Sequence, residues 1–459
     1  PIYKSAPLNS RLNTGHHRLI LVLSVFSKIF EKHYFNSMKE FVDTFLNKHL
    51  SAYRMGHSCE HVLLRLTEEW RQNLDQNKIV GAVLMDLSKA FDCLPHELLI
   101  AKLEAYGFDH NTLKLLYSYL KGRKQTVSIN GIISTFLDLL SGVPQGSILG
   151  PILFNIFLND LFFAIKEANL HNFADDNTLS DVALSEGELI KRLESESCKA
   201  IDWLSQNSMI ANPNKFHGII LKKNRSDTSG RQITIKGNVI ETERDVVSLG
   251  ITIDNKLSFK KHISSICKKA SGKLNAIKRL RPLPCKKARK LLIDTYVYSN
   301  FNYCSTVWHF CGLGDIHKIE RINERCLRYI HNDYDCDHFD LIRKYNEVTM
   351  FVRRLRTICC EIYKTLKGTN AKYMIDLLSK RPSLYPSRSP YDLFVPKSNQ
   401  ITFGYNSFKV EAPRIWNMVP RKIREQDTLG KFKKELQTFE FPWCKCEKCL
   451  MEQTLHILS

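Results

Sequence analysis

A continuous apolar run from Ile79 to Met85, which ends at Asp86, limits the folds open to this chain more than any other segment. The run has the length of a strand. A strand that is apolar on both faces is typical of the centre of a sheet buried between two layers. Strands and helices are predicted to be interspersed over residues 1–255, and the remainder is predicted to be mostly helical. The sequence therefore predicts an α+β fold around a central strand that ends in a carboxylate.

Local signals predict the elements around this strand. Pro95 and Gly107 are placed to begin and end a helix. Asn130-Gly131, between two short β-type runs, is the strongest short-range signal for a hairpin turn. Further helices are predicted over residues 37–50, 58–77, 147–165 and 184–206, and strands near residues 218–221, 232–235 and 248–253.

The charge of the chain is concentrated in one segment. The 67 Lys and Arg residues exceed the 47 Asp and Glu residues by 20, which indicates a nucleic acid or another anionic surface as partner. Residues 256–290 hold 13 of the basic residues and no acidic one, with apolar residues at helical spacing. Off that apolar stripe lie Lys260, Lys261, Lys268 and Lys269. The segment is predicted to be a helix that follows phosphates; the alternative is a solvated helix face.

One apolar segment near the start is the nearest candidate for a membrane span. Leu19 to Phe26 is much shorter than the roughly 18 apolar residues that a span needs, and charged residues follow it. It is therefore predicted to be a buried helix, and no membrane partner is expected.

The 14 cysteines are too thinly spread for a disulfide scaffold, so a reduced, intracellular protein is expected. Near the end of the chain, Cys444, Cys446 and Cys449 precede His456, which raises the question of a zinc site. Their spacing matches no familiar zinc pattern, and a cysteine-containing tail is the preferred interpretation.

Two acidic groups are the candidates for chemistry. Asp86 ends the buried strand, and Asp175-Asp176 lie in a short turn-like segment flanked by apolar residues. Carboxylates in half-buried places are costly unless they are paired or bind a metal. Three of them suit Mg²⁺, which takes a few carboxylates and completes its shell with water and phosphate oxygens. The alternative is that Asp175-Asp176 only caps a turn.

A loop rich in glycine and proline, residues 141–151, lies between the two acidic groups. Gly142 and Gly146 would let the backbone approach a substrate closely, and Gln145 would be held on a stiff turn. The loop alone is weak evidence for a site, and its position between the acidic groups is what strengthens it.

With these residues in place, the sequence resembles the reverse transcriptases of LINE-type (non-long-terminal-repeat) retrotransposons, closest to jockey-like and chicken-repeat-like elements. The three motifs occur in the family's order, and they are Asp86-Leu-Ser-Lys-Ala-Phe-Asp92, Ser141-Gly-Val-Pro-Gln-Gly-Ser147 and Phe173-Ala-Asp-Asp176. Supporting matches are Ser27-Lys-Ile-Phe-Glu31, Tyr53-Arg-Met-Gly-His-Ser58, Gly122-Arg-Lys-Gln-Thr-Val127, Trp203, Asn212-Pro-Asn-Lys215, Leu249-Gly250, and Ser407-Phe to Phe432-Lys-Lys434. Departures are Arg18-Leu-Ile-Leu21, where the family usually has Arg-Pro-Ile-Ser, and Asn177, where Thr is common.

The resemblance implies a right-hand polymerase fold with fingers, palm and thumb, followed by a mostly helical C-terminal region. The expected domains are an N-terminal part of the fingers (1–60), a palm with a fingers insertion (61–255), a basic helical thumb (256–335) and a helical region with the cysteine-containing tail (336–459). Such elements also encode an endonuclease upstream, so a longer polyprotein is expected.

Carried over residue by residue, the resemblance implies that Asp86, Asp175 and Asp176 bind two Mg²⁺ ions, with Mn²⁺ as an alternative. Lys215 would lie near the leaving pyrophosphate; the alternative is a surface lysine. The reaction implied is attack of a primer 3′-hydroxyl on a deoxynucleoside triphosphate, templated by RNA.

The same comparison implies the substrate contacts. Phe91 would screen the 2′ position of the sugar, although on the residues alone it would be a core aromatic. Gln145 and Gly146 would face the incoming nucleotide and the template, and Arg54 and Arg123 would contact phosphates or template.

Three functional interpretations remain open in the sequence. The first is an RNA-directed DNA polymerase that copies retrotransposon RNA, with RNA template, DNA primer or target, and deoxynucleoside triphosphates as partners. The second is a catalytically inactive polymerase fold that only binds nucleic acid, which the altered Arg18 region favours and the intact aspartates oppose. A third, an intron-encoded maturase, fits the segment after Ser407 less well. The family implies translation in the cytoplasm and action in the nucleus; the oligomeric state, element RNA and insertion target are not readable.

Overall fold

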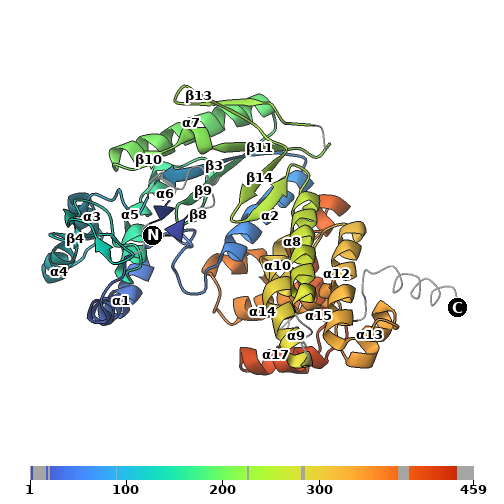
Figure 1. The fold of residues 1–459 in the computed structure, drawn as a ribbon. Coiled ribbons are helices and arrows are strands. Elements are labelled where there is room, and N and C mark those ends of the chain that lie inside the picture. The colour runs from blue at the N-terminus through green and yellow to red at the C-terminus, as the bar shows by residue number, and fades with distance from the viewer. Residues whose placement is uncertain are drawn as a thin grey trace.

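The structure is a computed structural model, and it describes residues 2–3, 17–18, 21–88, 90–224, 227–280, 285–380 and 392–441 (Figure 1). A five-stranded antiparallel sheet forms the centre of the first half. Its strands are β3 (Ile79–Ser88), β8 (Asn169–Phe173), β9 (Asp176–Ala183), β10 (Ile210–Ala211) and β11 (His217–Leu221). The packed helices of the second half lie on the far side of α2 (Cys59–Asp75) from the sheet (Figure 1).

The central strand β3 has a different core on each face. It pairs with β9 on one side and with β10 and β11 on the other. Val80, Ala82 and Leu84 pack into a core shared with α2 and the C-terminal helices. The alternate residues Val83 and Met85 pack into a second core on the side of α7 (Glu186–Gln206). This period-2 alternation with both faces buried confirms the predicted central strand.

Glycine at position 81 is required by the packing of α7 on the sheet. A Cβ atom at Gly81 would lie 2.7 Å from a side-chain carbon of Leu193 and 3.0 Å from one of Leu189. Both leucines belong to α7, which is capped by Ser185, whose hydroxyl accepts a hydrogen bond from the Glu188 amide. The absence of a side chain at one strand position therefore lets the long helix approach the sheet.

The helices other than α2 that precede β8 share the second core with the sheet, and short strands accompany them along the chain. The helices are α1 (Val25–Phe45), α3 (His96–Ala105), α4 (His110–Leu120), α5 (Leu149–Leu158) and α6 (Leu161–Ala164). The short strands are β1 (Ile2–Tyr3), β2 (His17–Arg18), β4 (Lys124–Gln125), β5 (Ser128–Ile129), β6 (Ile132–Ile133) and β7 (Leu137–Asp138). Asn130 and Gly131 have φ angles of 51° and 82° between β5 and β6, as a hairpin turn of this type requires.

Short elements connect the sheet to the helical half. They are the strands β12 (Gln232–Ile235), β13 (Asn238–Glu241), β14 (Asp245–Ser248) and β15 (Ile251–Asp254). The 3₁₀ turn Pro213–Lys215 lies earlier, between β10 and β11 of the sheet. The single strand predicted over 248–253 is wrong, because Leu249 (φ 46°) and Gly250 (φ 79°) form the turn of a β14–β15 hairpin.

The C-terminal half is helical, as predicted. Its helices are α8 (Lys260–Arg279), α9 (Lys286–Leu292), a π-helical segment (Ile293–Tyr298), α10 (Ser299–Asn302), α11 (Ser305–Trp308), α12 (Leu313–His331), α13 (His338–Tyr345) and α14 (Met350–Leu366). They continue with a 3₁₀ turn (Lys372–Leu377), strands β16 (Ser379–Lys380) and β17 (Leu393–Phe394), a π-helical turn (Ile401–Tyr405), α15 (Phe408–Met418), α16 (Arg421–Arg424) and α17 (Leu429–Thr438). The apolar stripe predicted for the basic segment is buried from Phe259 to Ile277 and faces this helical core.

The N-terminal helix differs from its prediction in two ways. It spans Val25–Phe45 rather than residues 37–50. The apolar segment before and at its start is not buried, since Val22, Val25 and Phe26 are 96%, 70% and 84% exposed. Local hydrophobicity alone predicts burial there, whereas the tertiary structure places no covering layer of described residues over these side chains.

The α+β fold class with a mostly helical C-terminal region is confirmed. Among the described residues, no helix is both long enough and apolar enough to cross a membrane. The division into fingers, palm and thumb at residues 60, 255 and 335 stays a prediction. The cysteine-containing tail, with Cys444, Cys446, Cys449 and His456, lies outside the described residues.

Candidate active site

The predicted carboxylates meet at one end of the central sheet. Asp86 on β3 lies directly opposite Asp176 on β9 in the antiparallel register. Directly opposite residues of such a pair have their Cβ atoms about 5 Å apart on the same face of the sheet. Asp175 precedes Asp176 in the tight turn between β8 and β9, where Ala174 has a φ of 57°. The strand that carries Asp86 continues to Ser88, so this carboxylate lies within the strand and not at its last residue.

Two buried asparagines hold the turn that carries the paired aspartates. The Asn172 side-chain amide donates to the Ala174 carbonyl oxygen (2.8 Å) and to Oδ1 of Asn177 (2.9 Å). The Asn177 side-chain amide in turn donates to the Asp175 carbonyl oxygen (3.2 Å). Asn177, which departs from the family pattern, therefore has a structural role, because together with Asn172 it fixes the backbone on both sides of Asp175.

The site concentrates negative charge. Partial burial, together with the negative charges of Asp175 and Asp86, raises the pKa of Asp176 from 3.8 to about 6. Nζ of Lys215 lies 3.3 Å from Oδ2 of Asp86 and supplies a positive charge at the edge of the group. Like charges on directly opposite strand positions are destabilising, so this arrangement favours an added cation.

The three carboxylates are chemically suited to bind a divalent ion, but their side chains are not oriented towards one common point. In the described part of the chain, no three His, Cys, Asp or Glu side chains are oriented so that they could hold one ion together. The backbone nevertheless brings three carboxylates to one place, and burial together with the charges of the two neighbouring aspartates raises the pKa of Asp176. Hard oxygen donors with excess negative charge are the donor set that Mg²⁺ takes. The donor set therefore fits the ion, and side-chain rotation would be needed for the three carboxylates to converge on it.

The glycine-rich loop is fixed against the segment that follows β3. The backbone amides of Gly142 and Val143 donate to the carbonyl oxygens of Leu94 (2.7 Å) and Phe91 (2.9 Å). A Cβ atom at Gly142, which has a φ of 84°, would lie 2.8 Å from the backbone of residues 91 and 92. Glycine is therefore required at position 142 by both its conformation and this close approach.

Comparison with known proteins decides the family. Residues 4–253, more than half of the chain, match the model of the family described as reverse transcriptase (RNA-dependent DNA polymerase). The chain belongs to the reverse transcriptase family.

Relatives of this chain come from mobile elements. The probable RNA-directed DNA polymerase from transposon BS of Drosophila melanogaster is 25% identical over 335 residues, which cover 70% of this chain and 36% of that protein. The RNA-directed DNA polymerase from mobile element jockey of Drosophila funebris is 25% identical over 269 residues, which cover 57% of this chain and 29% of that protein. The chain thus spans about a third of the length of these curated relatives, and the similarity supports the LINE-type resemblance.

Among solved structures, an apo telomerase from Candida tropicalis aligns with 74% of this chain and 56% of that chain, at 12% identity and a TM-score of 0.41. A likeness at this level decides nothing about function.

Phe91, the residue predicted to screen the sugar, is half-buried. The Phe91 ring stacks on Phe154 with a centroid distance of 4.3 Å and an interplanar angle of 18°. The Tyr53 ring meets Phe91 edge-on at 5.9 Å. Phe91 is therefore supported by the core without being enclosed in it, which is compatible with both interpretations of this residue.

Gln145 and Gly146 lie at the accessible part of the loop. Nε2 of Gln145 donates to Oδ1 of Asp92 at 2.7 Å, and Gly146 is exposed with a φ of 102°. Asp92 therefore orients Gln145, a role that sequence reasoning missed. Asp92 ends the first motif, which was the available signal, but only the fold shows that its carboxylate faces the loop.

The two predicted arginine contacts have partners within the protein. The Arg54 guanidinium donates to the carbonyl oxygens of Asn47 (2.8 Å) and Leu50 (3.1 Å) and lies 3.2 Å from Oδ1 of Asp43. These bonds fix the chain between α1 and α2, so Arg54 has a structural role. Arg123 donates to the Tyr119 carbonyl oxygen (3.2 Å), with its guanidinium carbon 4.9 Å from the centre of the Tyr119 ring.

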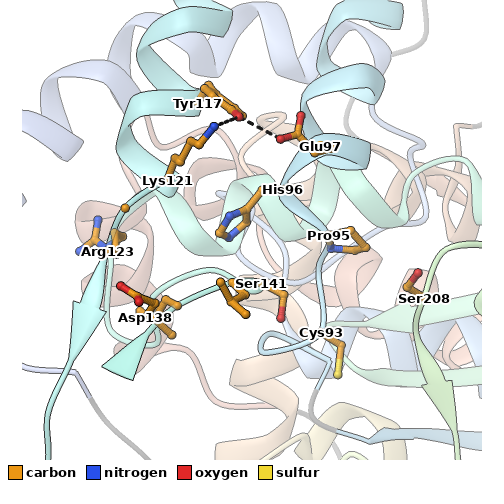
Figure 2. Close-up of a pocket in the computed structure, with 13 residues that line it drawn as sticks. Cys93, Pro95, His96, Glu97, Tyr117, Lys121, Arg123, Asp138, Ser141 and Ser208 are labelled. Atoms are coloured by element: carbon orange, nitrogen blue, oxygen red, sulfur yellow. Dashed lines mark hydrogen bonds between the residues drawn. The ribbon is translucent and has the colours of Figure 1, made fainter. Parts of the chain in front are cut away.

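Arg123 also lines a cavity of about 730 Å³ between α3, α4 and the β4–β7 strands, in which Lys121, Tyr117 and Glu97 form a hydrogen-bonded chain (Figure 2). Ser141 of the glycine-rich loop lines the same cavity. No sequence motif signals this cavity, because its lining comes from separate elements.

The basic helix α8 exposes the four lysines predicted to contact phosphates. Lys260, Lys261, Lys268 and Lys269 are all exposed, while the apolar side of the helix is buried. Lys261 forms an ion pair with Asp245 of β14. Among the described residues, the other three lysines have no acidic side chain within ion-pair distance, and the role of all four in binding phosphates stays a prediction.

Proposed function

We propose that this chain is an RNA-directed DNA polymerase that copies the RNA of a LINE-type retrotransposon into DNA. The observation that carries the proposal is the direct opposition of Asp86 and Asp176, with Asp175 in the adjoining turn, in a chain of the reverse transcriptase family. A site that concentrates three carboxylates beside one lysine and a glycine-rich loop suits nucleotidyl transfer, in which the protein mainly positions reactants and neutralises charge.

Two divalent ions, Mg²⁺ or alternatively Mn²⁺, are proposed for Asp86, Asp175 and Asp176. Bound there, such ions would lower the pKa of the primer 3′-hydroxyl and neutralise the triphosphate oxygens. The raised pKa of Asp176 supports this assignment, because burial and, to a smaller extent, the charges of Asp175 and Asp86 disfavour its ionised form, and a bound cation would offset both effects.

The other proposed roles belong to residues around the carboxylates. Lys215, 3.3 Å from Asp86, would attract the phosphates of the leaving pyrophosphate and keep them near the site. Gln145, held by Asp92, would contact the nucleotide or the template, and Phe91 would lie under the sugar. In these assignments the loop and the half-buried ring only position the substrates.

The proposed partners are an RNA template, a DNA primer or target, and deoxynucleoside triphosphates. The exposed lysines of α8 would follow the phosphates of the primer–template duplex. We further propose translation in the cytoplasm and action on nuclear DNA, as for other members of this class.

Primer extension tests the function directly. Purified protein is incubated with an RNA template, a DNA primer and the four deoxynucleoside triphosphates, with Mg²⁺ or with EDTA. Extension with Mg²⁺ and none with EDTA is expected. Failure to extend, with primer–template still bound, would contradict the proposal and identify the chain as an inactive nucleic-acid-binding remnant.

A further inference from the structure

Glu31 is a buried carboxylate outside the predicted catalytic group. It lies in α1, and its relative exposure is 0%. Oε2 accepts hydrogen bonds from the backbone amides of Ile148 (2.5 Å) and Leu149 (3.2 Å), and Oε1 accepts one from the Ser27 hydroxyl (3.1 Å). A buried carboxylate is costly unless its oxygens are satisfied, and here amide donors of another element satisfy them.

These amides belong to the start of α5, directly after the glycine-rich loop. The first amides of a helix have no partner within the helix. The Ser147 hydroxyl accepts from Gly150 (2.9 Å), and Glu31 takes the amides of Ile148 and Leu149. A negative charge at this helix end is also favoured by the helix dipole. A residue 117 positions earlier thus completes the cap of α5.

The same N-terminal part of the chain holds the loop at a second point. The Leu21 amide donates to the Gln145 carbonyl oxygen at 3.0 Å. On its other side, the Gln145 side chain donates to Asp92. Gln145 is therefore fixed between the segment that follows β3 and the residues around α1, and Glu31 fixes the backbone three residues further on.

We propose that Glu31 is a positioning residue for the loop that carries Gln145 and Gly146, so that α1 sets the geometry of nucleotide binding. The inference rests on the proposed polymerase function. It assigns no contact with substrate to Glu31. Its effect passes through the Ile148 and Leu149 amides, which fix the end of the loop.

Two substitutions separate hydrogen bonding from simple bulk. E31A leaves two amides at the helix start without their partner. E31Q keeps an acceptor oxygen for these amides, and its side-chain amide can donate to the Ser27 hydroxyl, which is able to accept. V42A is the matched control: Val42 is buried in the same helix, 1% exposed, about 16 Å along the axis from Glu31.

Hydrogen exchange of the full chain tests the contact without using activity. We expect E31A to lose protection of the amides of residues 147–150 by about tenfold or more relative to V42A, and E31Q to restore most of it. Equal exchange in E31A and V42A would overturn the proposal. If E31A does not fold, E31D replaces it, because this variant keeps the charge but is one methylene shorter. We then expect E31D to lose protection of the amides of residues 147–150 relative to E31Q.

Steady-state primer extension tests the consequence. We expect E31A to raise the KM for deoxynucleoside triphosphate by about tenfold, with kcat changed less than about threefold, because a displaced loop weakens nucleotide placement. V42A should leave KM unchanged, and E31Q should return KM to near the parent value. A KM that rises equally in E31A and V42A would contradict the proposal. A parent protein that extends no primer would instead refute the proposed function, and the exchange experiment would still decide whether Glu31 holds the loop.

Discussion

Two carboxylates, Glu361 in the helical half and Asp176 at the end of the sheet, lie in opposite electrostatic environments. Glu361 of α14 is buried and bonds to His61 Nε2 (3.1 Å), Lys364 Nζ (2.5 Å) and the Asn370 amide (3.1 Å). Burial alone would raise its pKa, but the hydrogen bonds from His61 and Lys364 outweigh burial and lower the pKa to about 2. At the end of the sheet, partial burial and two neighbouring aspartates raise the pKa of Asp176 to about 6.

This difference in environment distinguishes a structural carboxylate from a candidate functional one. In the helical half, the protein itself supplies the groups that stabilise a buried charge, as is usual for structural carboxylates. At the end of the sheet, the carboxylates repel one another, and Lys215 lies beside Asp86 at the edge of the group. A carboxylate with a raised pKa in an accessible site is a candidate ligand-binding group.

The largest expected effect is that of Asp175→Asn. The amide keeps the shape of the side chain and removes a charge that would hold the metals. Since metal-based stabilisation is worth several kcal/mol, primer extension should fall by about a thousandfold or more, while RNA binding is largely retained. Single-turnover extension and a filter-binding assay measure the two properties.

Asp181→Asn is the matched control on the same strand. Asp181 lies five positions further along β9 than Asp176, is buried and pairs with Arg192 (2.8 Å), so it is not part of the candidate site. The Asp181→Asn variant should extend primer at a rate per folded molecule within a few-fold of that of the parent. Activity of Asp175→Asn within about tenfold of the parent would contradict the assignment of the catalytic site.

The second effect concerns the basic helix. Neutralising Lys260, Lys261, Lys268 and Lys269 together should weaken binding to primer–template of any sequence. The slope of log affinity against log salt should shrink by roughly 0.7 to 0.9 per phosphate contact, with the smallest share from Lys261, which pairs with Asp245. Fluorescence anisotropy over a range of salt concentrations measures the slope.

The control uses four exposed lysines of the same helical half, Lys422, Lys431, Lys433 and Lys434 of α16 and α17. Neutralising these removes the same charge from another face and should leave the salt slope unchanged. If the two sets of substitutions give equal salt slopes, the exposed face of α8 is an ordinary solvated helix face and does not bind phosphates.

A smaller effect is expected in sugar selection. Phe91→Val should raise ribonucleotide incorporation relative to deoxynucleotide by at least about tenfold, because an apolar pocket without a steric block rejects a hydroxyl only weakly. The ratio of kcat/KM for the two nucleotides measures this selection. Phe432→Val is the control, since Phe432 also stacks on a ring, Tyr363 at 4.4 Å, but is fully buried in the helical half.

Phe432→Val should lower the free energy of unfolding by about 3 kcal/mol without changing selection. If Phe91→Val shows the same pattern, with loss of stability and an unchanged sugar preference, then Phe91 is a core residue.

The smallest effect is on the pH dependence of stability, and it has opposite signs in the two regions. Asp176 has a folded pKa above its ordinary 3.8, so its stabilising contribution is present below about pH 4 and is lost as the pH rises through 6. Glu361 has a folded pKa below its ordinary 4.5, so its contribution is present above that value and is lost as the pH falls towards 2.

Thermal unfolding of the parent, Asp176→Asn and Glu361→Gln in EDTA checks these signs. Between about pH 4 and pH 7, the parent should lose Tm relative to Asp176→Asn, by on the order of 2 °C. The difference between the parent and Glu361→Gln should instead shrink as the pH falls below 4.5. The same sign for both variants would show that the two carboxylates are not in different environments.

Sequence reasoning succeeded where the signal is local. The apolar run before Asp86 predicts a buried strand, Asn130-Gly131 predicts its hairpin, and the apolar stripe of 259–277 predicts the buried face of α8. It failed where a turn decides the extent of a strand, or where a covering layer decides whether a side chain is buried. The turn at Leu249-Gly250 divides a predicted strand, and Val22 and Phe26 are exposed despite their apolar character.

The sequence by itself determined the family, the α+β class and the identity of the candidate carboxylates, because these follow from residue types in short motifs. Only the tertiary structure decided that Asp86 lies opposite Asp176 and that Glu31 caps the helix beginning near Ile148. The physical reason is the same in both cases. Strand register and the capping of one helix by another are set by the packing of whole elements, and no residue within either motif encodes the partner 90 or 117 positions away.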